Sequence, residues 1–156
     1  MKHILTTAAA AAIAATPLAA QDLSVVGSWS SLPLHQQFET PFWTETLPEA
    51  SGGSINVSLT THGEMNLGVA DVYRLLGQGV YDVAMTVADY AVADSPALEG
   101  LDVPLVALSA DEARAMVDAA RPMVEDIYRD TFNSHVLAIA PYPPQVVFCN
   151  AEVNSL

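Results

Sequence analysis

Basic residues are scarce in this sequence, and the only lysine is Lys2. Lys and Arg together number 5 against 18 Asp and Glu, which gives a formal net charge of −13. Nucleic acids and anionic membrane surfaces bind proteins through clusters of Lys and Arg. The composition therefore excludes both as partners.

Cysteine is scarcer still. Cys149 is alone, so an internal disulfide framework is excluded. It follows Val-Val-Phe, which predicts a small core residue. Cysteine pairs and His-x-x-x-His spacing are absent, and so is the Gly-x-Ser-x-Gly motif of hydrolases. The sequence indicates neither a metal nor a cofactor, and it offers no catalytic constellation.

The first 20 residues are typical of a secretory leader. Lys2 and His3 precede an uncharged, alanine-rich run of about a dozen residues, and Pro17 and Leu18-Ala19-Ala20 follow. The run is too short to span a hydrocarbon core of about 30 Å. We expect cleavage after Ala20, with Ala19 nearly as good, and an exported, non-membrane-spanning product of 136 residues. That length fits one domain.

The rest of the sequence alternates strand and helix patterns, which predicts an α/β fold with an open, mostly parallel sheet flanked by helices. Apolar or alternating runs predict strands at 23–27, 55–59, 81–87 and 135–140, and a fifth at 145–149. Helices are expected at 32–50, 66–77 and 109–127.

Spacing and capping residues refine the helices. In the first, Leu34, Phe38 and Phe42 recur every four residues and predict the buried face, with a kink at Pro41. Asn66 is the expected cap of the second helix, whose inward residues are Leu67, Val69, Val72, Leu75 and Leu76. In the third, Ser109 and Glu112 form a capping box and Pro122 is expected to bend the helix.

A ligand of such a sheet binds beyond the carboxyl ends of its strands. This rule favours the loops after each predicted strand, and the candidate ligand-binding residues on them are Trp29, Glu64, Met65, Asp89 and Tyr142. Each has a structural alternative: Trp29 can serve packing, and Glu64 or Asp89 can cap a helix. His35 and His62 lack an evident metal or nucleophile partner and are interpreted as structural.

The four arginines point away from this predicted pocket. Arg114, Arg121 and Arg129 have acids four residues away on the face opposite the apolar stripe, which predicts a solvated ion-pair face. Arg74 lies opposite the inward residues of the second helix. A domain that held a carboxylate by itself would need such a cation in the pocket.

Several segments together resemble the periplasmic solute-binding subunit of TRAP transporters, the DctP-like family. These are the Ala-Ser-Gly-Gly helix end within 49–57, Gly63-Glu64, the Leu-x-x-Gly-x-x-Asp-Val junction within 72–84, and residues 94–105 and 146–150. They cover nearly the whole chain after the leader, in the family's order. The resemblance implies a periplasmic-binding-protein-like lobe, with 21–144 as the N-terminal lobe and 145–156 as the start of a strand that crosses to a second lobe.

The same resemblance implies a function. Such a protein closes on a small organic acid and delivers it to TRAP membrane permease subunits driven by an ion gradient. Family members are about twice this length and carry the carboxylate-binding arginine in the second lobe, so the sequence is expected to be a fragment. Two alternatives stay open: the binding protein of an ATP-driven importer, and a periplasmic hydrolase.

Overall fold

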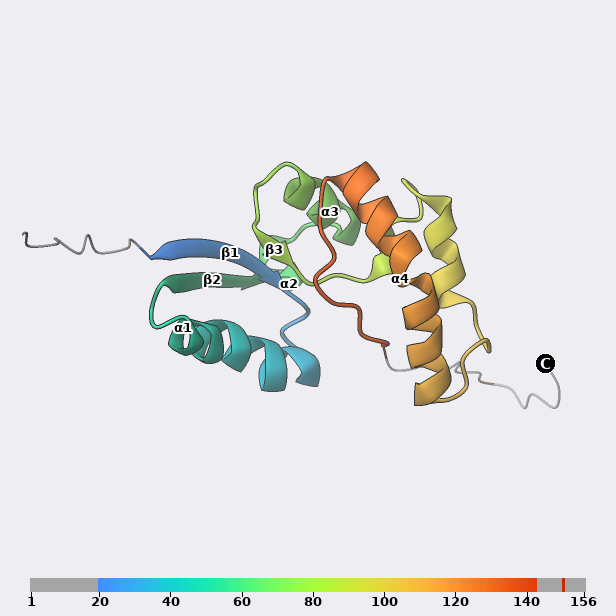
Figure 1. Ribbon diagram of the computed structural model, residues 1–156, viewed down its shortest axis with the longest axis horizontal. Helices are drawn as coiled ribbons and strands as arrows, with labels where there is room; N and C mark the ends of the chain where they lie inside the picture. Colours follow the sequence, from blue (N-terminus) through green and yellow to red (C-terminus); the bar gives the residue numbers. More distant parts are fainter. Residues whose placement is uncertain (1–19, 143–149, 151–156) are drawn as a thin grey trace, which may run out of the picture.

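The computed structural model describes residues 20–142 and residue 150, and it contains a small parallel sheet flanked by helices (Figure 1). Its strands are β1 (Gln21–Gly27), β2 (Ile55–Thr61) and β3 (Val83–Ala84), in the order β2-β1-β3. The α/β prediction is thereby confirmed at this level. Most of the leader, the expected strand at 145–149 and Cys149 lie outside the described residues.

Strands β1 and β2 pair along their whole length, from Gln21 with Ile55 to Gly27 with Thr61. Both match the predicted runs and extend them by two residues. Strand β3 is shorter than the expected 81–87, and only Val83 and Ala84 pair with β1. The chain before it is held differently, because the Asp82 carboxylate accepts hydrogen bonds from the Ser24 amide (2.8 Å) and hydroxyl (2.7 Å).

The first crossover is a continuous helical segment, residues 33–50, that packs on β2 (Figure 1). It contains two π-helical turns, η1 (His35–Glu39) and η2 (Phe42–Thr46), before the short α1 (Leu47–Ala50). Pro41 lies between these turns, so the disturbance expected at this residue takes the form of wider turns on either side.

The predicted buried face of this segment is wrong by one residue. Leu34, Phe38 and Phe42 are exposed, Phe38 to 64%. The residues turned inward begin one place later, and they are His35, Glu39, Trp43 and Leu47. This shift has a physical cause at the start of the helical segment. Gly27 has no side chain, so the His35 and Glu39 side chains have room to pack against the end of β1.

Two helices connect β2 to β3, the short α2 (His62–Met65) and α3 (Val69–Gly77). The prediction that Asn66 caps α3 is wrong. Asn66 ends α2 instead, in a left-handed conformation with φ 50°. Gly68 is the N-cap of α3 instead. Val72 is buried as predicted, and the neighbouring Tyr73 is buried too.

The main core lies where α3 meets the long helix α4 (Ala110–Phe132) and the 3-10 turns η3 (Ala88–Ala91) and η4 (Pro96–Asp102). Tyr73, Tyr128 and Phe132 form a cluster of rings whose centroids lie 5.4–5.5 Å apart. At the start of α4 the Ser109 hydroxyl accepts from the Glu112 amide, as predicted. The Glu112 carboxylate accepts from the Leu108 amide rather than from that of Ser109.

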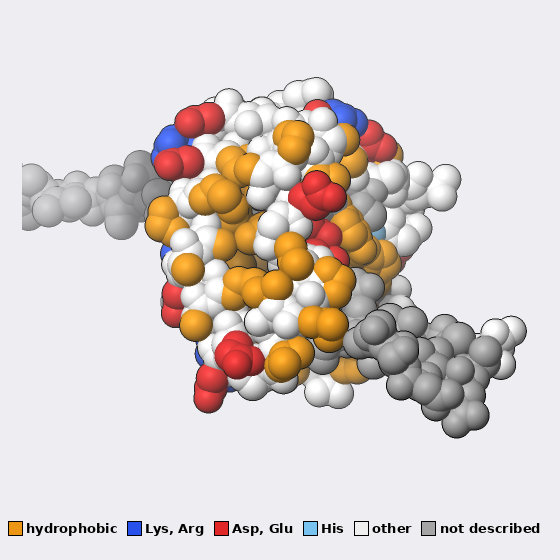
Figure 2. Space-filling model, turned by 90° about the vertical axis from the view of Figure 1, so that its right-hand side faces the viewer, with side chains coloured by type: hydrophobic (Ala, Val, Ile, Leu, Met, Phe, Trp, Pro, Cys, Tyr) orange, Lys and Arg blue, Asp and Glu red, His pale blue; other side chains and the backbone are white. Residues whose placement is uncertain are grey.

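The strand expected at 135–140 is absent from the described chain, which is irregular from Ser134 to Tyr142. Val136 and Ile139 pack against the Tyr73–Tyr128–Phe132 core instead of joining the sheet. The short β3 offers little edge to pair with. Leu137 is left 76% exposed, and Figure 2 shows other hydrophobic side chains gathered on the face that lies to the right in Figure 1.

Candidate functional site at the carboxyl edge of the sheet

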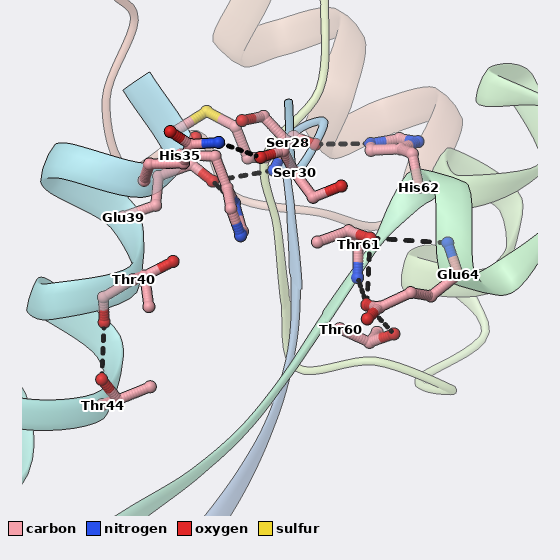
Figure 3. Close-up of polar contacts among 12 residues, drawn as sticks. Ser28, Ser30, His35, Glu39, Thr40, Thr44, Thr60, Thr61, His62 and Glu64 are labelled. Carbon is pink, nitrogen blue, oxygen red and sulfur yellow. Dashed lines mark hydrogen bonds and ion pairs between the residues drawn. The ribbon is translucent and has the colours of Figure 1, made fainter. Parts of the chain in front are cut away.

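The three strands are parallel, so their carboxyl ends meet at one edge of the sheet. The chain leaves β1 for β2 on one side and then crosses to β3 on the other. The loops after β1 and β3 therefore diverge, and such a switch point is where open α/β sheets bind ligands. Figure 3 shows the polar side chains that gather there.

Three rings meet at this edge, one from the loop after each strand. The Trp29 indole stacks on the His62 imidazole, with ring centroids 5.0 Å apart and planes 13° from parallel. Tyr90 approaches Trp29 edge-on at 6.5 Å. Tyr90 is 43% exposed and Trp29 is half-buried. The cluster thus presents an aromatic surface to solvent above a buried histidine.

His62 is almost fully buried, at 4% exposure. Its Nε2 lies 2.9 Å from the carbonyl oxygen of Met85, which only accepts hydrogen bonds, so Nε2 carries a proton. Nδ1 is buried and has no hydrogen-bond partner within the part of the chain that the structure describes. The interpretation of His62 as structural accounts for Nε2 and leaves Nδ1 unexplained.

His35 is the second buried histidine that the sequence analysis interpreted as structural. The sequence analysis did not identify its partner, Glu39. His35 Nδ1 lies 2.9 Å from Glu39 Oε2, and the same oxygen accepts from the Ser28 amide at 2.8 Å. A Cβ at Gly27 would come within 2.9 Å of His35 Cε1. The sequence signal was a His-x-x-x-Glu spacing shortly after a glycine that ends a strand.

Ser28, His35 and Glu39 resemble the parts of a hydrolase triad, but their geometry differs from one. The His35–Glu39 pair approaches β1 from the side that a Gly27 side chain would occupy. The Ser28 backbone amide, and not its hydroxyl, bonds the Glu39 carboxylate. Ser28 Oγ makes no hydrogen bond to any described residue.

Of the other predicted site residues, Glu64 and Met65 lie on α2. The Glu64 carboxylate accepts from the Thr61 amide (2.8 Å) and hydroxyl (2.9 Å), completing a capping box. These bonds, the one to the Thr61 hydroxyl foremost, lower the pKa of Glu64. Glu64 therefore holds the start of α2, a helix that the sequence did not predict, and lies within it rather than in the loop expected before the next helix. Met65 is half-buried and ends the same helix.

Asp89 lies beside Tyr90 in a cleft of about 550 Å³. Burial raises the pKa of Asp89, and the negative charge of Asp102 adds to the effect. The cleft is lined by Ala70, Asp89, Tyr90, Val92, Glu99 and Asp102. Tyr142, the remaining candidate, is 51% exposed, and within the described residues it makes no ring contact with Trp29, His62 or Tyr90.

The arginines form ion pairs on α3 and α4. Arg121 pairs with Glu125 at 3.2 Å, as the spacing predicted. Arg114 pairs with Asp111 instead of Asp118, and Arg129 with Asp126 and Asp130. Arg74 contacts Asp71 and Asp94. The acids three residues before Arg114 and Arg129 are closer partners than those the four-residue spacing favoured.

No protein-family model matches the chain, and neither does any curated protein or solved structure. None of the helices in residues 20–142 combines the length and apolarity needed to cross a membrane. Within the same residues, His, Cys, Asp and Glu side chains do not gather in a group able to hold a metal ion.

Proposed function

We propose that this chain is an extracytoplasmic solute-binding protein of a TRAP-type transporter, and that it captures a small organic acid. The observation that carries the proposal is the meeting of Trp29, His62 and Tyr90 at the carboxyl edge of the sheet. Each ring comes from a different strand end, and this edge is the usual ligand site of open parallel sheets. The resemblance in sequence supports the transporter class.

The aromatic surface suits the carbon skeleton of a small solute. Trp29 and Tyr90 offer flat, partly exposed faces, and Asp89 lines the cleft that continues from Tyr90. On this proposal the leader exports the chain to the periplasm. The loaded protein then delivers its solute to a membrane permease driven by an ion gradient.

Calorimetry with a panel of small organic acids tests the binding step. It uses the protein with the second lobe that the resemblance implies, because the arginines of this lobe are paired with acids on other surfaces. We expect Trp29→Ala to weaken binding about tenfold, because aromatic contacts of this kind contribute about 1 kcal/mol beyond the area they bury. Trp43→Ala is the matched control, since Trp43 packs against Phe42 on the first helical segment. If Trp29→Ala binds as tightly as the unchanged chain, or if no acid binds at all, the proposal fails.

A transport assay separates the two importer classes. Uptake in cells should stop when the sodium gradient is collapsed and should continue when ATP is depleted while that gradient is held. The opposite pattern would assign the chain to an ATP-driven importer.

A further inference from the structure

The chain between η4 and α4, residues 103–108, is apolar and lies on the surface. Leu108 is 76% exposed and Leu105 is 70% exposed, and Val103 and Val106 are exposed too. These residues run along the side of the molecule that lies to the right in Figure 1, where Figure 2 shows hydrophobic side chains gathered. Single exposed apolar residues are ordinary, but a contiguous exposed patch marks a surface that another molecule covers. We call residues 103–108 the apolar segment.

The apolar segment is anchored at both ends. Before it, Leu98 of η4 is fully buried in the main core. After it, the Leu108 amide donates to the Glu112 carboxylate at 2.8 Å, beside the N-cap of α4. Within the segment, the ring of Pro104 fixes the φ of this residue. A surface that is ordered before binding loses less conformational entropy when a partner binds. The segment is therefore suited to binding in the conformation it already has.

Leu105 has a backbone conformation that is unfavourable for its side chain. Its φ is 65°, in the left-handed region, where bulky residues are rare and less stable than glycine. Burial does not offset this strain, because the Leu105 side chain is mostly exposed. Strained residues are concentrated at functional sites. The conformation of Leu105 therefore favours a role for its side chain outside the folded chain itself.

The charges beside the apolar segment are acidic. Glu99 and Asp102 precede the segment on η4, and Asp111 and Glu112 follow it in the first turn of α4. Arg114 pairs with Asp111. Within the described residues the arginines pair with other acids, so neither Glu99 nor Asp102 has an ion-pair partner. A surface complementary to this one is apolar at its centre and carries Lys or Arg at its rim.

The same charges disfavour other molecules that could cover the segment. In a two-fold dimer the same surface meets itself, so the acids of both copies would face each other. An anionic membrane is repelled in the same way. Residues 143–156 of this chain include Glu152 and neither Lys nor Arg, so they do not supply the complementary charge.

We infer that the apolar segment docks another protein, through a part of that protein that combines apolar side chains with Lys or Arg. The apolar side chains cover Leu105 and Leu108, and the basic side chains pair with Glu99 and Asp102. This contact uses none of the three rings at the carboxyl edge of the sheet. The inference therefore goes beyond the proposed function and does not depend on it.

Three synthetic helical peptides of equal length test the inference, with binding followed by fluorescence anisotropy of a labelled peptide. The first has a leucine face flanked by lysines, the second has glutamates in place of the lysines, and the third has serines in place of the leucines. We expect the first to bind the full chain at least about tenfold more tightly than either of the others. Its binding should weaken as salt is raised from about 0.05 M to about 0.5 M.

Variants of the chain locate the contact. Leu105→Gly removes the side chain and adopts the left-handed φ without strain, so it should weaken binding of the lysine–leucine peptide at least about fivefold and lower the melting temperature by no more than about 2 °C. Asp102→Asn should weaken binding several-fold. Val80→Ala, 50% exposed between α3 and β3, and Glu49→Gln, exposed on α1, are the matched controls and should bind as the unchanged chain does.

Three results would overturn the inference. If the serine peptide binds as tightly as the leucine peptide, or if Leu105→Gly leaves the affinity unchanged, only net charge attracts the peptide. If the chain sediments as a dimer that Leu105→Gly dissociates, a second copy covers the segment. If the peptide binds this chain but not a longer protein with the second lobe that the resemblance implies, that lobe covers the segment. The proposed function stands in each case, because its solute-binding test uses Trp29 instead.

Discussion

The packing of α3 against α4 can be tested at Gly77, the last residue of α3. A Cβ at this position would lie 2.3 Å from the Phe132 carbonyl oxygen and 3.0 Å from its carbon. An ordinary contact needs about 1 Å more, and a backbone carbonyl cannot rotate aside, so overpacking costs about 3 kcal/mol. Alanine recovers about 1 kcal/mol of helix propensity. Gly77→Ala should therefore lower the free energy of unfolding by about 2 kcal/mol.

Urea unfolding followed by circular dichroism measures this change, and in a thermal scan it corresponds to about 8 °C for a chain of this size. Gly63→Ala in α2 is the matched control, because nothing lies within 4 Å of its Cβ. That variant should stay within about 0.5 kcal/mol of the unchanged chain. Equal stability of Gly77→Ala and Gly63→Ala would refute the close approach of the two helix ends on which the core is built.

Two further predictions concern buried ionisable groups. Glu39→Ala should destabilise by about 3 kcal/mol in urea unfolding, because it leaves the His35 Nδ1–H and the Ser28 amide without their acceptor, whereas Glu39→Gln should cost less. Burial, together with the neighbouring Tyr73, raises the pKa of Tyr128 above its ordinary value. The stability this protonated hydroxyl contributes is complete below about pH 10, the pKa of an unfolded tyrosine, and is lost as the pH rises further. Tyr128→Phe should therefore move alkaline unfolding, followed by circular dichroism, to higher pH; an unchanged midpoint would contradict the burial of this hydroxyl.

Local signals predicted two of the strands and one helix N-cap. The alternation in 55–59 and the apolar run at 23–27 were confirmed, because a strand with one buried face leaves this period in the sequence. Ser109 was confirmed as the N-cap of α4. The run at 135–140 has the same apolar content but packs on the core, since pairing depends on an available edge and not on composition.

Features that depend on the phase of a helix were not predictable in this way. A four-residue spacing fits the stripe from Leu34 equally as well as the one from His35, and the cavity left by Gly27 decides between them. Trp29 was named from its place after a strand. Its contact with His62 depends on the register of β1 and β2, which no local pattern encodes.

The π-helical turns around Pro41 have a consequence for how this protein can be altered. The Thr40 amide bonds the carbonyl five residues before it, and the Leu47 amide does the same. A π turn is in effect an α turn with one residue inserted. Deleting one residue within Phe42–Thr46 would return that turn to α geometry without touching His35 or Glu39. A length variant of this kind would remove the widened turn and leave the histidine–carboxylate pair in place, and so separate the contribution of that pair from that of the helix that carries it.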